Sequence, residues 1–171
     1  PEEDPDRIQP PEHLREADKS WLDHGRYDQE LRSTWQSDAN FELTLPYYGF
    51  SDVDLAVGHG DETVGHYDRW LKQRAANGDD LRGRKNQLPG NNYIAPQAWR
   101  TAIPEDLYPT AYVAERTIKY LENYSRGDRS KPFFLQCSFP DPHHPFTPPG
   151  RYWNMYNPED IAVPVSFNPG E

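Results

Sequence analysis

Two adjacent histidines, His143 and His144, and the carboxylate of Asp141 lie in the segment from Pro140 to Pro149. Half of these ten residues are proline, and each proline holds its φ angle near about −65°, so the segment is stiff before any packing forms. A histidine has an ordinary pKa of about 6.5, so it can donate a proton to a leaving oxygen near neutral pH. We therefore predict that His143 is catalytic, as a proton donor and anion contact, and that His144 contacts substrate.

A second loop, Gly58-His-Gly-Asp61, offers His59 as a further substrate-binding candidate, with a plain turn residue as the alternative reading. Its glycine spacing fits neither a dinucleotide fingerprint nor a phosphate-binding loop. The histidines and aspartates of the two loops are residue types that suit zinc. Neither a His-x-x-x-His nor a Cys-x-x-Cys spacing is present, so we assign no metal ligand and keep a zinc site as an alternative.

The elements that must position these loops follow from the apolar pattern and the turn residues. They are a strand over residues 52–57, a helix over 62–76, a long connection over 77–104, a helix over 110–124 and a strand over 133–139. Alternating strands and helices predict an α/β fold with at least partly parallel strands. Both candidate loops then follow the carboxyl end of a strand, which is where open α/β sheets bind ligands.

Three details of these elements are testable. Asp61 is a good N-cap for the helix over 62–76. The strand over 133–139 carries apolar residues on both faces, so it should be buried on both sides, with Cys137 in the core. The helix over 110–124 should bury one stripe of its surface. That stripe comprises Val113, Ala114, Thr117, Ile118 and Leu121.

The composition is acidic, with a formal net charge of −10. Such a balance argues against a nucleic-acid partner, which calls for a basic patch. No apolar run approaches the roughly 20 residues of a membrane span, so we expect no membrane partner. Residues 1–30 hold 10 acidic and 4 basic residues and are predicted to form an irregular acidic arm with a short helix near 12–22.

Cysteine usage excludes an internal disulfide framework, because there is one cysteine. It leaves the compartment open between cytoplasmic, periplasmic and secreted. The chain begins at Pro1 and its only methionine is Met155, so we expect an internal piece of a longer protein.

The pattern Lys131-Pro-Phe-Phe-Leu-x-x-Ser-Phe-x-x-Pro-His-x-Pro145 closely resembles the sulfatase family of the alkaline-phosphatase-like superfamily. The resemblance continues over residues 146–152 and extends back, more loosely, through 110–122 and 48–61. It implies a partial alkaline-phosphatase-like sheet flanked by helices, with residues 31–171 as the central part of the domain. It also implies a calcium-dependent hydrolase of sulfate esters with a formylglycine nucleophile. The histidine that contacts sulfate and protonates the leaving group in this family corresponds to His143.

The chain departs from the family pattern at its nucleophile and metal motifs. No Cys/Ser-x-Pro-x-Arg occurs; after Cys137 the proline arrives one position late, at Pro140, and Asp141 stands where arginine belongs. The aspartate pair that binds the metal is also absent. Calcium and formylglycine are therefore expected only in the intact enzyme, and the chain alone should be inactive.

The expected substrate is a small-molecule or glycan sulfate ester, with specificity contacts in the connection over 77–104 and in residues 151–156. Exposed strand edges should favour self-association into a homo-oligomer. A phosphonate or phosphodiester hydrolase of the same superfamily is one alternative. A non-catalytic module that binds through aromatic side chains is another, and its candidate residues are Trp99, Tyr152 and Trp153.

Overall fold

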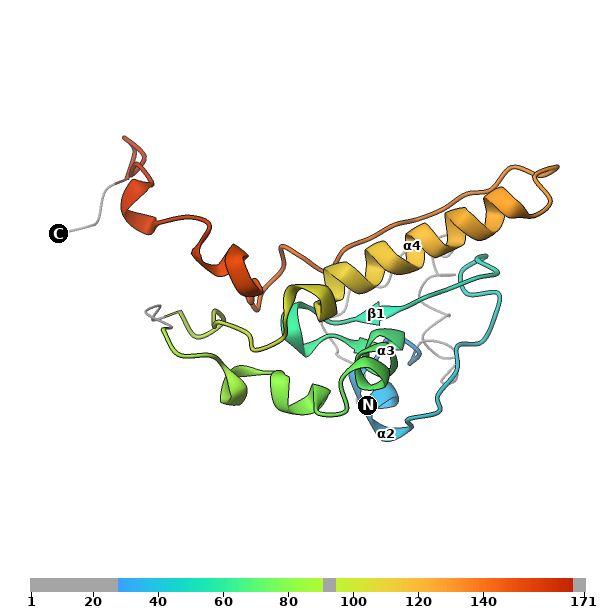
Figure 1. Cartoon of the computed structure of the whole chain (residues 1–171), viewed down its shortest axis with the longest axis horizontal. Helices are drawn as coiled ribbons and strands as arrows, with labels where there is room; N and C mark the ends of the chain where they lie inside the picture. Colours follow the sequence, from blue (N-terminus) through green and yellow to red (C-terminus); the bar gives the residue numbers. More distant parts are fainter. Residues whose placement is uncertain (1–27, 91–94, 168–171) are drawn as a thin grey trace, which may run out of the picture. The chain divides into compact units, whose positions relative to one another are not determined.

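The computed structural model describes residues 28–90 and 95–167 (Figure 1). The chain divides into two compact units between Asp52 and Val53. The fold is mixed α/β, with short and long helices and one small sheet in the described chain. The predicted helix near residues 12–22 lies outside the described residues.

The first unit is built around the short helix α2 (Arg32–Ser37). Trp35 is its buried residue; the indole N–H donates to the carbonyl of Gln29 at 2.7 Å, and the ring packs edge-on against Phe41. A tight turn follows, in which Tyr48 and Gly49 both have positive φ and join two bridged residues. This is the backbone geometry of a two-residue hairpin turn.

The second unit contains one small sheet, two longer helices and several 3₁₀ turns. They are β1 (Ala56–Val57), η3 (Gly60–Glu62), β2 (Val64–Gly65), α3 (His66–Arg74), η4 (Gly78–Leu81), η5 (Arg84–Asn86), η6 (Glu105–Leu107), α4 (Pro109–Arg126), η7 (Gly150–Asn154) and η8 (Pro158–Asp160). The core of this unit lies where α3 meets η6 and the start of α4. It comprises Tyr67, Trp70, Leu71, Ile103, Tyr108 and Tyr112.

Helix α4 confirms the predicted helix over 110–124. Pro109 lies in its first turn, where its missing N–H breaks no helix hydrogen bond. At the other end, the backbone N–H of Gly127 donates to the carbonyls of Asn123 and Tyr124. The predicted buried stripe is confirmed only in part: half-buried Val113 packs against the core, but the far end of the stripe is exposed. Ile118 and Leu121 are 55% and 40% exposed, and Tyr112 is the residue that α4 buries in the core. The aromatic side chain, rather than the aliphatic stripe, meets the rings of α3.

The first predicted strand is real but shorter, and its partner was not foreseen. β1 pairs antiparallel with β2, in the register Ala56↔Gly65 and Val57↔Val64, so the strands are not parallel as predicted. In the described residues the one parallel pairing is an isolated bridge between Ala98 and Phe146. Because β2 occupies residues 64–65, α3 begins at His66 rather than at residue 62.

Gly65 supplies the entry into α3, so the prediction that Asp61 caps this helix is wrong. Gly65 has a φ of 88°, which favours glycine. A Cβ added there would lie 2.5 Å from the carbonyl oxygen of Leu55, so the close pairing of β1 and β2 requires glycine.

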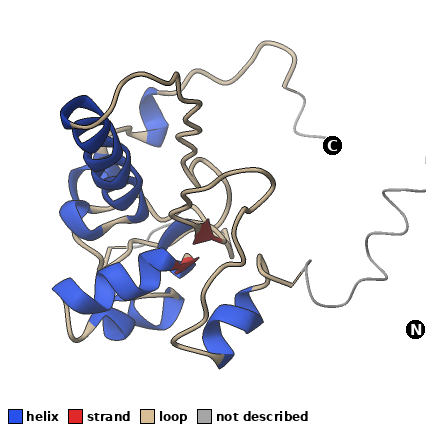
Figure 2. Ribbon diagram, turned by 90° about the vertical axis from the view of Figure 1, so that its right-hand side faces the viewer, coloured by secondary structure: helices blue, strands red, loops and turns tan. Residues whose placement is uncertain are grey.

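The predicted buried strand over 133–139 is also wrong. These residues are extended but join no sheet among the described residues (Figure 2). The segment returns along α4 in the opposite direction (Figure 1). Phe133 packs edge-on against Tyr124 with ring centroids 4.5 Å apart, and farther along the Thr117 hydroxyl donates to the Cys137 sulfur at 3.2 Å. With no neighbouring strand in the described chain, the backbone has no ladder to complete.

Exposure follows from this position. Phe133, Phe134 and Phe139 are 42%, 77% and 44% exposed, and Cys137 is exposed rather than buried in the core. One helix covers one side of the segment, and the apolar content that predicted burial on both faces therefore remains partly at the surface. Across the described chain, no helix combines the length and the apolar character needed to cross a membrane.

Candidate functional site

The two candidate loops meet, and their histidines lie against each other. The ring of His59 stacks on the ring of His143, with centroids 3.7 Å apart and an interplanar angle of 15°. The His144 ring lies 4.2 Å from that of His143 and is tilted by 34°. His143 and His144 are exposed and His59 is half-buried. All three predicted site residues thus lie in one place, which we call the histidine cluster.

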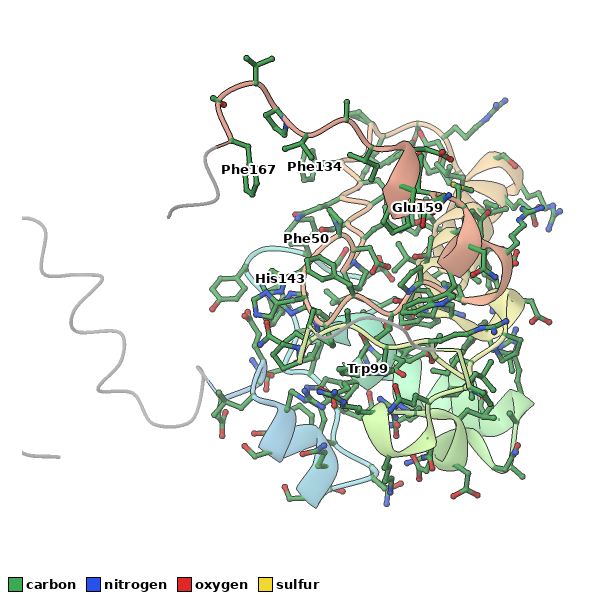
Figure 3. The ribbon with its side chains drawn as sticks, turned by 90° about the vertical axis from the view of Figure 1, so that its left-hand side faces the viewer. Phe50, Trp99, Phe134, His143, Glu159 and Phe167 are labelled. Carbon is green, nitrogen blue, oxygen red and sulfur yellow. The ribbon has the colours of Figure 1, made fainter. Side chains whose placement is uncertain are left out.

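One ring nitrogen of His143 has a fixed role. Nδ1 lies 2.7 Å from the carbonyl oxygen of His144, and a carbonyl can only accept, so Nδ1 carries a proton. In the neutral imidazole the lone pair is then on Nε2. The side chain is exposed, and Figure 3 shows it at the rim of the side-chain layer. Nε2 is consequently the ring nitrogen that can accept from or donate to a ligand.

The backbones of the two loops touch at Gly60. This residue has a φ of 56°, and an added Cβ would lie 2.6 Å from the carbonyl oxygen of Pro145 and 2.7 Å from Oγ1 of Thr147. The next residue along the chain, Asp61, donates its backbone N–H to Thr147 Oγ1 at 2.9 Å. Glycine at this position is therefore a condition for bringing His59 to His143.

The proline-rich loop is also held from two other directions. The backbone N–H of Phe146 donates to the carbonyl of Gln97 at 2.8 Å. On the other side, Tyr108 donates its hydroxyl to Asp141 at 3.3 Å, and Thr110 donates to the other oxygen of the same carboxylate at 3.1 Å. Burial raises the pKa of the Tyr108 hydroxyl, so it remains protonated and able to donate.

Asp61 has a role that the sequence did not reveal. Its carboxyl group is completely buried, and Oδ2 accepts from the Trp99 indole at 2.9 Å, the Thr101 hydroxyl at 2.8 Å and the backbone N–H of Gly83 at 3.1 Å. Oδ1 has no hydrogen-bond partner among the described residues. Burial is the largest influence on this carboxyl and raises its pKa, against the three hydrogen bonds that favour the charged form. Asp61 therefore ties its loop to residues that follow it by up to 40 positions.

The described residues do not fit a metal site. Within 28–90 and 95–167, no group of three or more histidine, cysteine, aspartate or glutamate side chains is placed so that it could hold an ion. The zinc alternative thus has no support in this part of the chain. Calcium fits no better, because it requires six to eight oxygen ligands.

A formylglycine nucleophile also finds no place in the described residues. Cys137 lacks the surrounding motif, and its sulfur accepts a hydrogen bond from α4.

The aromatic binding surface considered for a non-catalytic module does not form. Trp99 and Trp153 are 5% and 9% exposed, while Tyr152 is 42% exposed. Trp99 lies within the side-chain layer in Figure 3 and gives its indole N–H to Asp61. Its role is to fix a buried carboxyl, which leaves no shared surface for a ligand.

Comparison with known proteins bears directly on the resemblance. The chain is 35% identical over 104 residues to an arylsulfatase of Clostridium perfringens, an alignment that covers 61% of this chain and 20% of the relative. It is 30% identical over 114 residues to PehA of Trinickia caryophylli, a multifunctional alkaline phosphatase superfamily protein, covering 64% of this chain and 21% of the relative. The chain spans about a fifth of the length of these curated relatives. No family model matches, and no solved structure matches.

These two similarities confirm the predicted relationship to sulfatases and alkaline-phosphatase-like proteins. The roles of individual residues, the ions and the substrate are not addressed by them.

Proposed function

We propose that this chain is part of a hydrolase that cleaves sulfate esters, and that His143 contacts the anionic substrate and protonates the leaving oxygen. The observation that carries the proposal is the state of the His143 ring. Its Nδ1 is committed to a backbone carbonyl while the side chain is exposed. The similarity to an arylsulfatase supplies the reaction class.

The proposed step is a single proton transfer. As the bond between sulfur and the ester oxygen breaks, the electron pair stays on the oxygen, and the proton on Nε2 of the imidazolium passes to it. The hydrogen bond from Nδ1 to the His144 carbonyl stabilises the protonated ring. A positioned proton donor of this kind contributes typically about 10²–10⁴-fold to the rate.

His59 and His144 are proposed to contact the substrate beside His143. Their ring centroids lie 3.7 and 4.2 Å from that of His143, so both side chains are close enough to contact a ligand bound there. The calcium and formylglycine that the family resemblance implies belong, in this proposal, to other parts of a longer protein. In that case they supply charge neutralisation and the nucleophile, and the fold there is the alkaline-phosphatase-like sheet.

The proposal predicts that the 171-residue chain alone has negligible sulfatase activity, since one proton donor cannot replace a metal and a nucleophile. An assay on an aryl sulfate tests this point. Turnover comparable with an intact sulfatase would show that the chain carries a complete site.

The role of His143 is tested in the full-length protein with a series of aryl sulfates whose leaving groups differ in acidity. His143→Ala should reduce kcat by about 10²–10⁴-fold for a basic leaving group, and much less for an acidic one that needs no proton. An equal loss across the series would exclude proton donation and leave His143 with a binding role only.

A phosphonate or phosphodiester hydrolase of the same superfamily is the second candidate, and the similarity to PehA, a multifunctional alkaline phosphatase superfamily protein, is consistent with it. The same histidine can protonate the leaving oxygen of a phosphodiester, because both esters present an anionic centre and a departing oxygen. Parallel kcat/KM measurements on an aryl sulfate and on the matching phosphodiester, with the full-length protein, decide between the two. The larger value identifies the reaction.

A further inference from the structure

We infer that a buried chain of hydroxyl groups fixes the histidine cluster, with Thr147 and Tyr108 as positioning residues. Neither side chain is part of the cluster. Thr147 and Tyr108 are 1% and 3% exposed, and their oxygens lie 3.0 Å apart.

The direction of every hydrogen bond in this chain follows from its two ends. The backbone N–H of Asp61 can only donate, so Thr147 Oγ1 accepts from it at 2.9 Å. The carboxylate of Asp141 can only accept while it is ionised, so the Tyr108 hydroxyl gives it its one proton at 3.3 Å. The Thr147 hydroxyl must then donate to the Tyr108 oxygen. Each hydroxyl accepts once and donates once, and the hydrogen bonds run without interruption from Asp61 to Asp141.

The two ends of this series of hydrogen bonds lie close in sequence to the stacked histidines. Asp61 lies two residues after His59, and Asp141 lies two residues before His143. The backbone of Gly60 also lies close to the loop that carries Thr147. Loss of one hydroxyl leaves a buried donor or acceptor on its neighbour without a hydrogen-bond partner. The free-energy cost of this unpaired group favours separation of the two loops.

The position of the His143 ring can be measured without substrate. Only the expected effect on activity rests on the proposed function. A ring held by stacking and by a backbone hydrogen bond keeps Nε2 in one place, which is what proton donation requires. The placement of the loops is therefore measured first without any substrate.

The first test is a nuclear magnetic resonance experiment on the 171-residue chain with labelled histidine. Thr147→Val replaces the hydroxyl by a methyl group of similar size and should abolish the ring-current shifts that His59 and His143 impose on each other. Thr147→Ser retains the hydroxyl and should restore them. Tyr108→Phe should likewise abolish the shifts.

Tyr112→Phe is the matched control for Tyr108→Phe. Tyr112 is equally buried, at 2% exposure, and its hydroxyl also donates to a carboxylate, Asp54, at 3.2 Å. That hydrogen bond is not part of the series that joins Asp61 to Asp141, so this variant should lose stability and keep the ring-current shifts. A loss of stability alone would move both tyrosine variants alike, whereas a positioning role separates them.

A measurement on the unaltered chain covers the case in which a variant fails to fold. The hydroxyl protons of Thr147 and Tyr108 should exchange slowly with water and show contacts to the Asp61 amide proton and to each other. Fast exchange of both protons would overturn the inference. So would unchanged histidine shifts in folded Thr147→Val and Tyr108→Phe.

A second arm measures activity in the full-length protein. Thr147→Val should lower kcat by up to about 10²-fold with a smaller change in KM, and Thr147→Ser should recover most of it. If the spectra show that the rings separate while activity is unchanged, the positioning role of Thr147 and Tyr108 is confirmed and the proposed role of His143 is wrong. If the rings remain stacked, the positioning role is wrong.

Discussion

The hairpin of β1 and β2 and the extended segment over 132–140 are built from similar apolar sequence but behave differently. Strands were predicted over 52–57 and over 133–139, each followed by a histidine loop. Residues 56–57 find their pairing partners within nine positions, at residues 64–65. The segment over 132–140 finds no strand in the described chain and lies along α4 with its phenylalanines partly exposed. Apolar content predicts an extended backbone, but burial also requires a neighbouring strand or helix, and the apolar content does not identify that neighbour.

The comparison also shows how the two histidines are held. His59 follows a paired strand and is followed by the buried carboxyl of Asp61. His143 follows the unpaired segment, so its loop depends on the hydroxyl groups of Tyr108 and Thr110, at the start of α4, and on backbone bonds to residues 97–99. The two loops are therefore held by different contacts, and a substitution can weaken the support of one loop without changing that of the other.

The largest effect is expected at Asp61, on the well-supported side. Asp61→Ala removes the acceptor of three buried donors, so the free energy of unfolding should fall by about 3–5 kcal/mol. Denaturant titration of the chain measures it. Asp54→Ala is the control, because that carboxylate is substantially exposed, and loss of its salt bridge to Arg116 and of the hydrogen bond from Tyr112 should together cost less, about 1–2 kcal/mol. Equal losses in both variants would show that burial of Asp61 has no consequence.

Asp61→Asn tests the charge rather than the contacts. Burial raises the folded pKa of Asp61 above its ordinary 3.8, so the folded state binds more protons than the unfolded state between these two values. The contribution of Asp61 to stability is therefore full below pH 3.8 and is lost as the pH rises through the folded pKa. The amide cannot titrate. The free energy of unfolding of Asp61→Asn, relative to that of the unaltered chain, should therefore increase as the pH rises across this window. A difference that is constant with pH would refute the raised pKa.

A somewhat smaller effect is expected where the two loops touch. Gly60→Ala adds both a Cβ clash with the loop at 145–147 and the strain of positive φ, so stability should fall by about 2–4 kcal/mol. Gly49→Ala is the matched control, because its φ is 89° and an added Cβ meets nothing within 4 Å. It should cost only the strain, about 1 kcal/mol. Similar losses at both glycines would mean that the loops can separate freely.

The extended segment should respond weakly. Phe133→Ala removes the edge-on contacts with Tyr120 and Tyr124 and should reduce stability by about 1 kcal/mol. Phe139→Ala provides the comparison, since Phe139 has nearly the same exposure, 44% against 42%, and no aromatic contact among those described. Its loss should be smaller, and the reverse order would show that the segment is held by something other than α4.

The smallest change in free energy is expected from a charge on the exposed side of this segment. If the segment pairs with another copy of the chain, Ser138→Lys should reduce self-association, because lysine on an open strand edge opposes pairing. Sedimentation at several protein concentrations measures the association, with Ser130→Lys outside the segment as control. A chain that remains monomeric at all concentrations would refute the predicted homo-oligomer.

Local signals predicted correctly what local contacts determine. The helix predicted over 110–124 is observed as α4, nearly residue for residue. Tyr67, Trp70 and Leu71 lie within the helix predicted over 62–76 and form part of the core. The family relationship was also carried by a local pattern, and the similarity to an arylsulfatase confirms it.

Long-range contacts were beyond the sequence. Asp61 and its loop are joined to Thr101 and to Thr147 across 40 and 86 positions, and no spacing rule links such residues. The stacking of His59 on His143 is of the same kind. Position at the ends of two predicted strands brought both loops into consideration, yet one of those strands does not exist as a strand. The loops meet because of Gly60 and buried hydroxyl groups, which carry no periodic signal.

Cys137 has a practical consequence. It is the only cysteine of the chain and lies at the surface of the extended segment. A maleimide dye should therefore attach at one defined site and report on the surroundings of residues 132–140. If the thiol reacts quickly in this polypeptide and slowly within a longer form of the protein, some further portion of that protein shields the segment, and the dye's emission would register the docking directly.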